Sequence, residues 1–374
     1  MRLARLDSFV LRYPDPNDHG GERLTVLVRA EDADGVTGWG EAIAMWPEAC
    51  KATCTILDEG FAPLLKAAGE IDTPRAWEMM RAQSWWYGEG GIASMALSAV
   101  DMALWDITGK RAGEPLWRLF GTRAHESLPA CASCHVNLPT LEACVAEVEG
   151  FRARGFGSVK LGLGKRGRSP IGQDARMAVR FVEMLRAALG DDFEILVDVG
   201  NGIRWDVPTV IDAARAMHDL GVGWIEEPFY PTDIAAHRAL KAAVAIPVAA
   251  GERCFTVTQY RDMIATGAVD VLGVDPARAE GITGFRATDA LVQAAGLTLN
   301  AHAWSTAVTT AASLHLSAAS TAARLFELKP HPVTVQDDLV AQPIRQTGGR
   351  VAPSDRPGLG IDVDEAVVRR LAIG

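Results

Sequence analysis

Short apolar runs alternate with amphipathic helical stretches along most of the chain after residue 126, and this alternation constrains the fold more than any other feature. The apolar runs read GSVKLG, FEILVDV, WIEEP, IPVAAGE, DVLGVD, LTLNAH and RLFEL, and stretches such as ARMAVRFVEMLRAALG separate them. Repeated strand–helix units form a parallel sheet, and seven or eight such units close into a barrel. We therefore expect an α/β chain built around a TIM-like barrel.

The segments on either side of this alternation have a different pattern. The first part combines the strand-like runs RLTVLVRAED and GVTGWGEA with a helix-rich stretch at 49–113, which is typical of a short sheet backed by helices. The tail contains the turn-rich run SDRPGLGI, and we expect it to pack back on the first domain. The predicted division is an α+β domain at 1–125, a barrel at 126–329 and a C-terminal segment at 330–374.

Composition excludes several classes of protein. The 374 residues carry a net charge of −10 and 48% of them are hydrophobic, so the chain can bury a sizeable core but offers no basic surface for nucleic acid. Charged residues at 2, 5 and 7 break up the start, and polar residues such as Asn300 and His302 interrupt the longest uncharged stretch, 290–323. We expect no signal peptide, no membrane span, a cytoplasmic protein and six free cysteine thiols.

Seven polar residues end or directly follow apolar runs. A spacing in the mid-twenties matches one strand, one helix and two loops, so these side chains should crowd the C-terminal mouth of one barrel, where barrel enzymes carry out their chemistry. A single charged residue after a strand is often only a helix cap, but seven in register favour a shared site. The residues are Lys160, Asp198, Glu226, Glu252, Asp275, His302 and Glu327, at intervals of 38, 28, 26, 23, 27 and 25.

Five of these seven residues are carboxylates, which would repel one another unless a cation neutralised them. Asp198, Glu226 and Glu252 offer oxygen ligands with no Cys or His among them, a set that favours a hard ion, Mg²⁺ more than Ca²⁺. Asp275 and His302 end successive strands, so the carboxylate could orient an imidazole that moves a proton. The residues alone thus predict a metal-dependent proton-transfer site.

A set of motifs then occurs in one order along nearly the whole chain. In this order and spacing the chain resembles the mandelate racemase and muconate lactonizing branch of the enolase superfamily. The resemblance implies an α+β capping domain over a modified TIM-like (β/α)7β barrel. The motifs are GWGEA at 38–42, ALSAVDMALWDITGK at 96–110, VKLG, ILVDVGNG, WIEEP, the Gly251-Glu252 pair, VDPARAEGITG, NAHAW, the strand-end Glu327 and PGLGI at 357–361.

The resemblance also implies roles for the residues at the mouth. Mg²⁺ would be held by Asp198, Glu226 and Glu252, where Glu226 is preferred to Glu227 because the family's ligand lies two residues before the proline. Asp275 and His302 would form the family's catalytic dyad. Lys160 would be the first lysine of the family's K-x-K pair, and Glu327, in its protonated form, the acid that faces the substrate carboxylate.

Two positions depart from the family pattern. Gly162 stands where the second lysine of the K-x-K pair is expected, so one face of the substrate lacks its usual base. Gly200 stands two residues after Asp198, where the family has asparagine, and Asn201 follows it. A base on one face only argues against racemisation and favours elimination or ring rearrangement.

Two other motifs point to different chemistry and are set aside. The CASCH run at 131–135 matches a c-type haem attachment pattern, but haem attachment needs export, and the run lies in the predicted first barrel strand, where His135 could line the pocket floor. The run at 162–167 matches G-x-G-x-x-G, but the next helical pattern begins only near Asp174, too late for a dinucleotide site.

We therefore expect an enzyme with Mg²⁺, or Mn²⁺ as a substitute, that abstracts the α-proton of a carboxylate substrate with His302, aided by Asp275, Lys160 and Glu327. Dehydration of an aldonate or aldarate is the preferred reaction. The alternatives are a cycloisomerase of a sugar-acid lactone and a metal-binding scaffold without catalysis. We also expect a homo-oligomer, with a small sugar acid as the partner. The candidate substrate-binding residues are His19, Arg23, Trp46, Asn201 and Trp304.

Overall fold

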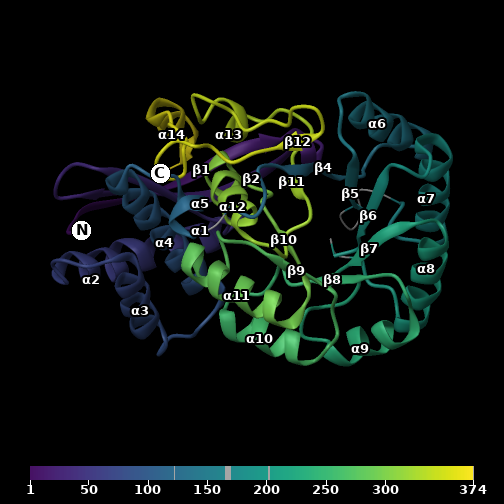
Figure 1. The fold of residues 1–374 in the computed structure, drawn as a ribbon, viewed down its shortest axis with the longest axis horizontal. Helices are drawn as coiled ribbons and strands as arrows, with labels where there is room; N and C mark the ends of the chain where they lie inside the picture. Colours follow the sequence, from purple (N-terminus) through teal and green to yellow (C-terminus); the bar gives the residue numbers. More distant parts are fainter. Residues whose placement is uncertain (122, 165–169, 201–202, 374) are drawn as a thin grey trace.

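The computed structural model describes residues 1–121, 123–164, 170–200 and 203–373. Within this part of the chain, eight parallel strands form a nearly closed barrel, and a helix follows each of the first seven (Figure 1). The strands are β4 (Leu128–His135), β5 (Ser158–Gly162), β6 (Glu194–Asp198), β7 (Val222–Glu226), β8 (Val248–Ala250), β9 (Val271–Val274), β10 (Thr298–Ala301) and β11 (Phe326–Leu328). The helices are α6 (Leu141–Ala153), α7 (Ala175–Leu189), α8 (Val207–Asp219), α9 (Ile234–Ala243), α10 (Val257–Ala265), α11 (Gly281–Ala295) and α12 (Ala307–Ala319).

The two edge strands of the sheet, β10 and β11, meet and so close the barrel. The strands pair in the order β10-β9-β8-β7-β6-β5-β4-β11, and a parallel bridge between Leu299 and Ala323 links the first of these to the segment before the last. The modified TIM-like (β/α)7β barrel with an N-terminal capping domain is therefore confirmed. Among the described residues, no helix combines the length and apolar character needed to cross a bilayer, and the uncharged stretch at 290–323 is divided among α11, β10 and α12. The six cysteines are free thiols.

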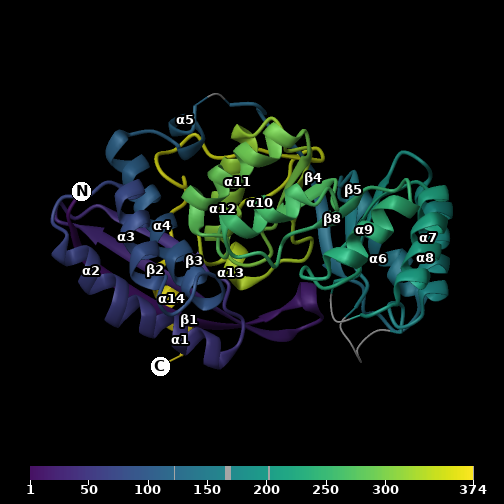
Figure 2. The ribbon, with the colours of Figure 1, turned by 90° about the horizontal axis from the view of Figure 1, so that it is seen from below.

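The capping domain is an antiparallel sheet covered by helices. The sheet order is β13-β1-β2-β3, so the C-terminal strand completes a sheet that the first strands begin (Figure 2). The domain boundaries after residues 125 and 329 stay a prediction. The elements outside the strand–helix units of the barrel are β1 (Leu3–Asp15), a short helix η1 (Pro16–Asp18), β2 (Gly21–Asp32), β3 (Thr37–Ala42), α1 (Pro47–Thr55), a π-helical turn η2 (Ile56–Phe61), α2 (Ala62–Ala67), α3 (Thr73–Ser84), α4 (Gly91–Ala112), α5 (Leu116–Leu119), α13 (Thr334–Asp337), β12 (Arg350–Val351), α14 (Glu365–Leu371) and β13 (Ala372–Ile373). Of these, β12 pairs with the barrel strand β4.

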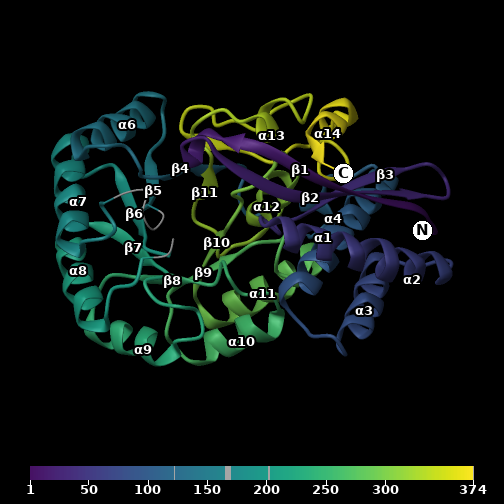
Figure 3. The same ribbon diagram turned by 180° about the vertical axis from the view of Figure 1, so that it is seen from behind.

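The long hairpin of β1 and β2 reaches from the capping sheet to the barrel. Figure 3 shows it stretching toward β4 and β11. Asn17, at the tip of this hairpin, donates to the carbonyl oxygen of His331 at 2.9 Å and accepts from its backbone N–H at 2.8 Å. His19 Nε2 lies 2.8 Å from the carbonyl oxygen of His135, the last residue of β4. The hairpin tip is therefore fastened to the barrel at its mouth.

The contact between β3 and α4 depends on glycine. Gly40 lies so close to α4 that an added Cβ would overlap the carbonyl oxygen of Ala99. Gly38 stands in the same relation to Ala103 one turn further along the helix. The GWGEA motif thus lets the strand backbone pack directly on the helix backbone, which sets the position of Glu41 directly after Gly40.

We expect Gly40→Ala to destabilise the protein by about 2 kcal/mol or more. The new Cβ would overlap the carbonyl oxygen of Ala99, which belongs to the backbone of α4 and cannot move by itself. Urea titration followed by circular dichroism measures the change in the free energy of unfolding. Gly60→Ala is the matched control, since a Cβ at Gly60 meets nothing within 4 Å and the residue lies in a helical turn. Equal stability of the two variants would contradict the close-packing argument.

Candidate active site

The seven polar residues predicted to share the barrel mouth lie within the last three residues of a barrel strand or within two residues after it. Several strands also place an inward-facing apolar residue two positions earlier, for example Leu196 before Asp198 and Leu325 before Glu327. These side chains form a buried cluster inside the barrel that includes Trp224 and Cys131. The charged groups therefore stand on an apolar floor that excludes water from below.

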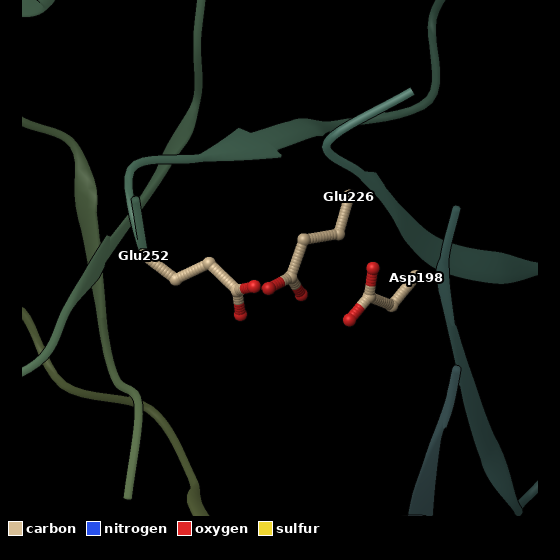
Figure 4. Close-up of side chains that lie close together, drawn as sticks. All are labelled: Asp198, Glu226 and Glu252. Atoms are coloured by element: carbon tan, nitrogen blue, oxygen red, sulfur yellow. The ribbon is translucent and has the colours of Figure 1, made fainter. Parts of the chain in front are cut away.

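Three carboxylates converge at one side of this mouth. Asp198 and Glu226 end β6 and β7, and Glu252 follows β8; each offers an oxygen within 4.8 Å of the other two (Figure 4). Gly251 sets the position of Glu252, because its φ of +124° suits glycine and an added Cβ would lie 2.7 Å from the carbonyl oxygen of Gly273. The group could hold a metal ion.

The electrostatics of these carboxylates fit a bound cation. Burial raises the pKa of Glu226 to about 8, and the neighbouring Asp198 and Glu252 add to this although Lys160 opposes it. Burial also raises the pKa of Asp198 to about 6, with a further contribution from Glu252. Asp198 and Glu226 thus resist ionisation at this position. An all-oxygen set of this kind matches the ligands that hard divalent cations prefer.

Lys160 lies among the acids as their partner. Its Nζ is 3.0 Å from Glu226 Oε1 and 2.9 Å from Glu327 Oε1, with Asp198 and Glu252 at 3.9 and 4.0 Å. Burial lowers the pKa of Lys160, but these carboxylates outweigh burial and hold it well above the usual range. The side chain is therefore a fixed positive charge rather than a base.

Asp275 and His302 form a hydrogen-bonded pair beside the triad. His302 Nδ1 lies 2.8 Å from Asp275 Oδ2, and its Nε2 points toward Glu252 Oε2 at 3.4 Å. Burial lowers the pKa of His302, but Glu252 and Asp275 more than compensate and raise it above its ordinary value. Nε2 is thus the ring atom that can exchange a proton next to the acidic triad.

Glu327 lies beside Asn300 and Lys160 at the mouth. Its Oε1 accepts from Asn300 Nδ2 at 2.6 Å and lies beside Lys160, while its buried Oε2 has no hydrogen-bond partner among the described residues. Burial raises the pKa of Glu327, but Lys160 and His302 lower it overall. A protonated Glu327 facing a substrate carboxylate stays a prediction. Its second oxygen is available for a further partner.

The predicted substrate-binding residues fall into different environments. His19 and Trp46 are exposed on the capping domain, Trp46 by 64%, whereas Arg23 and Trp304 are buried. Asn201, and part of the glycine-rich run at 162–167, lie outside the described residues. The substrate-binding role of these residues stays a prediction.

Arg23 belongs to a buried charge network that joins the two domains. Its Nη2 lies 3.2 Å from Asp18 Oδ2, and Lys329 Nζ lies 2.7 Å from Asp15 Oδ2. Both cations contact the ring of Trp304, with Arg23 Cζ at 4.3 Å and Lys329 Nζ at 4.7 Å from its centroid. The network thus fixes the side chain of Trp304, two residues after His302.

Glu41 holds the same loop from the capping sheet. Its carboxylate accepts from the hydroxyls of Ser305 at 2.5 Å, Thr306 at 2.6 Å and Thr309 at 2.5 Å. These residues form the start of α12, where backbone N–H groups and the helix dipole favour a negative charge. The capping domain therefore fixes the segment that carries His302.

Sequence reasoning missed several members of the site. Asn300 lies two residues before His302. Trp224 lies two residues before Glu226, and its Nε1 donates to Glu226 Oε2 at 3.0 Å. The two-residue period of a strand could have identified both. Arg253 forms ion pairs with Glu227 and, at 3.7 Å, with Glu252. Its Nη2 also donates to the carbonyl oxygen of Gly200 at 2.5 Å.

Comparison with known proteins places the chain in a family. The model of the mandelate racemase / muconate lactonizing enzyme N-terminal domain matches residues 20–121, and an enolase C-terminal domain-like model matches residues 143–367. These two domains define an enzyme of the enolase superfamily. The chain belongs to its mandelate racemase and muconate lactonizing branch.

Characterised relatives include acid-sugar dehydratases and cycloisomerases. The chain is 30% identical over 379 residues to a 3,6-anhydro-α-L-galactonate cycloisomerase from Streptomyces coelicolor, with 100% of both chains covered. It is 29% identical to a D-mannonate dehydratase from Caulobacter sp., covering 92% of this chain and 90% of that one. A solved racemase structure from Streptomyces coelicolor, with bound magnesium, matches with a TM-score of 0.87 at 29% identity, covering 99% of this chain and 100% of the other.

We expect Mg²⁺ to raise the thermal unfolding temperature by several degrees, because it would bind the folded triad and not the unfolded chain. Asp198→Asn should abolish this shift, and the chelator EDTA should reverse it in the wild type. Differential scanning calorimetry measures both effects. Asp191→Asn, an exposed acid in the loop before β6, is the matched control and should retain the shift. A shift that persists in Asp198→Asn and Glu252→Gln would exclude the triad as the metal site.

Proposed function

We propose that this protein uses Mg²⁺, or Mn²⁺ in its place, to abstract the α-proton of a sugar acid, and that dehydration of an aldonate or aldarate follows. The observation that carries the proposal is the Asp275–His302 pair, which presents a ring nitrogen 3.4 Å from Glu252 of the acidic triad. A proton acceptor beside a cation site is the arrangement that removal of a proton next to a carboxylate requires.

Removal of the α-proton from a carboxylate leaves a doubly negative enediolate. Mg²⁺ bound at the triad would supply positive charge that stabilises this species. Asp275 holds Nδ1 of His302, so Nε2 accepts the proton. Lys160 balances the charge of the substrate carboxylate. That carboxylate, placed beside the unpartnered Oε2 of Glu327, raises the Glu327 pKa by like-charge repulsion and allows the two groups to share a proton.

The absence of a side chain at Gly162 supports elimination over racemisation. Racemisation needs a second base on the other face of the α-carbon, and the family's second lysine is missing here. Elimination needs only one base, followed by loss of an oxygen from the β-carbon. The exposed capping-domain residues His19 and Trp46 are proposed to contact the sugar hydroxyls and to set specificity.

Cycloisomerisation is the second candidate, favoured by the likeness of the whole chain to a 3,6-anhydro-α-L-galactonate cycloisomerase. In a 3,6-anhydro acid the ring oxygen is attached to C3, which is the β-carbon relative to the carboxylate. The same proton removal therefore expels the ring oxygen, which remains attached to the product. The two reactions use one set of mouth residues and differ in whether the oxygen leaves as water.

We expect His302→Asn to reduce α-proton exchange by roughly 10²–10⁴-fold, the usual contribution of a positioned general base. Proton NMR of aldonates, aldarates and their lactones in D₂O follows the exchange, together with the loss of substrate. His218→Asn, on the exposed side of α8, is the matched control and should keep full activity. Exchange unchanged in His302→Asn, or interconversion of both α-epimers by the wild type, would rule out the base assignment. Mg²⁺ binding without exchange in any acid would indicate a scaffold without catalysis.

Mass spectrometry of the product distinguishes the two candidate reactions. Dehydration gives a product lighter by one water, whereas cycloisomerisation gives an isomer of unchanged mass. We expect loss of water from an aldonate or aldarate. Turnover confined to lactones and anhydro acids would instead establish the second candidate.

In the same panel of sugar acids, Trp46→Ala should change the ratio of kcat/KM values among the substrates without affecting Mg²⁺ binding. Unchanged ratios would show that Trp46 does not contact the substrate.

A further inference from the structure

His135 ends β4 at the barrel mouth, directly beside the position where the family's second lysine is missing. In the parallel pairing of β4 with β5, His135 lies opposite Gly162, and Ser133 lies opposite Lys160. Residues at one register on neighbouring strands share a face, as do alternate residues along one strand. Lys160 reaches the acids inside the barrel, and Cys131 belongs to the interior cluster. His135 therefore projects into the mouth, above Gly162.

The His135 ring is packed against the loop that carries the base. Its centroid lies 4.7 Å from that of Trp304 in an edge-to-face contact at 78°. Trp304 follows His302 by two residues and is fixed by a 3.1 Å hydrogen bond from its Nε1 to the carbonyl oxygen of Ser133. In the barrel, β11, with Glu327, is the one strand between β4 and β10. The two histidines thus flank the strand whose acid would face the substrate carboxylate.

We propose that His135 is the general acid that protonates the departing β-oxygen while His302 acts as the base. The inference rests on the proposed function, since it assigns the second proton transfer of that same elimination. The Lys160 ammonium is held among carboxylates, and His302 already carries the proton taken from the α-carbon. An unprotonated leaving group would depart as hydroxide or alkoxide, and the pKa of water, about 15.7, shows how poor such a group is. His302 can return this proton only to an oxygen on its own face of the substrate, so an oxygen that leaves from the opposite face, beside Gly162, needs a separate acid.

The proposed step balances without any co-reactant. The α-C–H bond breaks, its proton goes to His302 Nε2, and its electron pair forms the enediolate. The enediolate then forms the carbon–carbon double bond as the β-C–O bond breaks. The oxygen takes the electron pair of that bond and a proton from the His135 imidazolium, and leaves as water or as a hydroxyl of the opened ring. The enol tautomerises to a 2-keto-3-deoxy acid, and exchange with solvent resets both histidines.

The test separates the two proton transfers. We expect His135→Gln to keep α-proton abstraction within about threefold of wild type, measured as deuterium in substrate recovered from D₂O, while product formation falls roughly 10²–10⁴-fold. His218→Gln is the matched control, because His218 is exposed on α8, outside the barrel mouth. It should leave product formation within about threefold.

A leaving group that needs no proton provides the decisive arm. The β-fluoro analogue of an acid that the wild type converts loses fluoride, so His135→Gln should eliminate fluoride at a rate within about threefold of wild type. Added imidazole should restore part of the turnover of His135→Ala. This variant also replaces His135→Gln in the test if the glutamine variant does not fold.

The outcomes have distinct meanings. Normal turnover of hydroxy acids by His135→Gln would overturn the assignment, and so would equal impairment of fluoride and water loss, since that result indicates a structural role. Failure of imidazole to act on a folded His135→Ala would count against it in the same way. Retained exchange in His302→Asn would instead overturn the proposed function itself, independently of His135.

Discussion

Mutual repulsion among buried carboxylates at the barrel mouth is the constraint on which the rest of this structure depends. Asp198, Glu226 and Glu252 would lie far apart if their side chains were free to move, yet the ends of three adjacent strands hold their oxygens within 4.8 Å. Lys160 contributes one positive charge, which leaves the pKa of Glu226 raised to about 8 by burial and by its neighbours. Backbone hydrogen bonds of the barrel hold the acids together, and a divalent cation is what such a cluster is suited to bind.

The capping domain supplies the other half of the site by fixing a loop of the barrel. Glu41 binds the start of α12, and the ion pair of Asp15 with Lys329 spans a sequence separation of 314 residues. Between them, Trp304 is held by two cations and one hydrogen bond, so its orientation depends on both domains. The loop that carries His302 is therefore held in place by the capping hairpin, which couples assembly of the fold to assembly of the base.

The sequence predicted the barrel and the members of the mouth because both follow from local periodicity. A strand–helix repeat fixes which residues end each strand, so the pairing of Asp275 with His302 follows from the order of the strands alone. The strand β1 was not predicted, because charged residues such as Arg5 and Arg12 interrupt its apolar pattern on a hairpin that is exposed on one side. The burial of Arg23 could not be predicted either, since it depends on contacts with segments distant in the chain. The lowered pKa of Glu327 likewise depends on Lys160 beside it.

Water loss and ring opening need the same groups at the mouth, so these groups do not determine which of the two reactions occurs. Both need a cation at the triad, a base at the α-carbon and a proton for the departing oxygen. What differs is whether the β-oxygen belongs to a free hydroxyl or to a ring, and this is a matter of the shape around the sugar. In this protein we propose that the capping side provides that shape, where His19 and Trp46 are exposed and His19 contacts the end of β4. If the proposed roles hold, a dehydratase and a cycloisomerase on this fold would differ in the capping loops more than in the residues at the mouth.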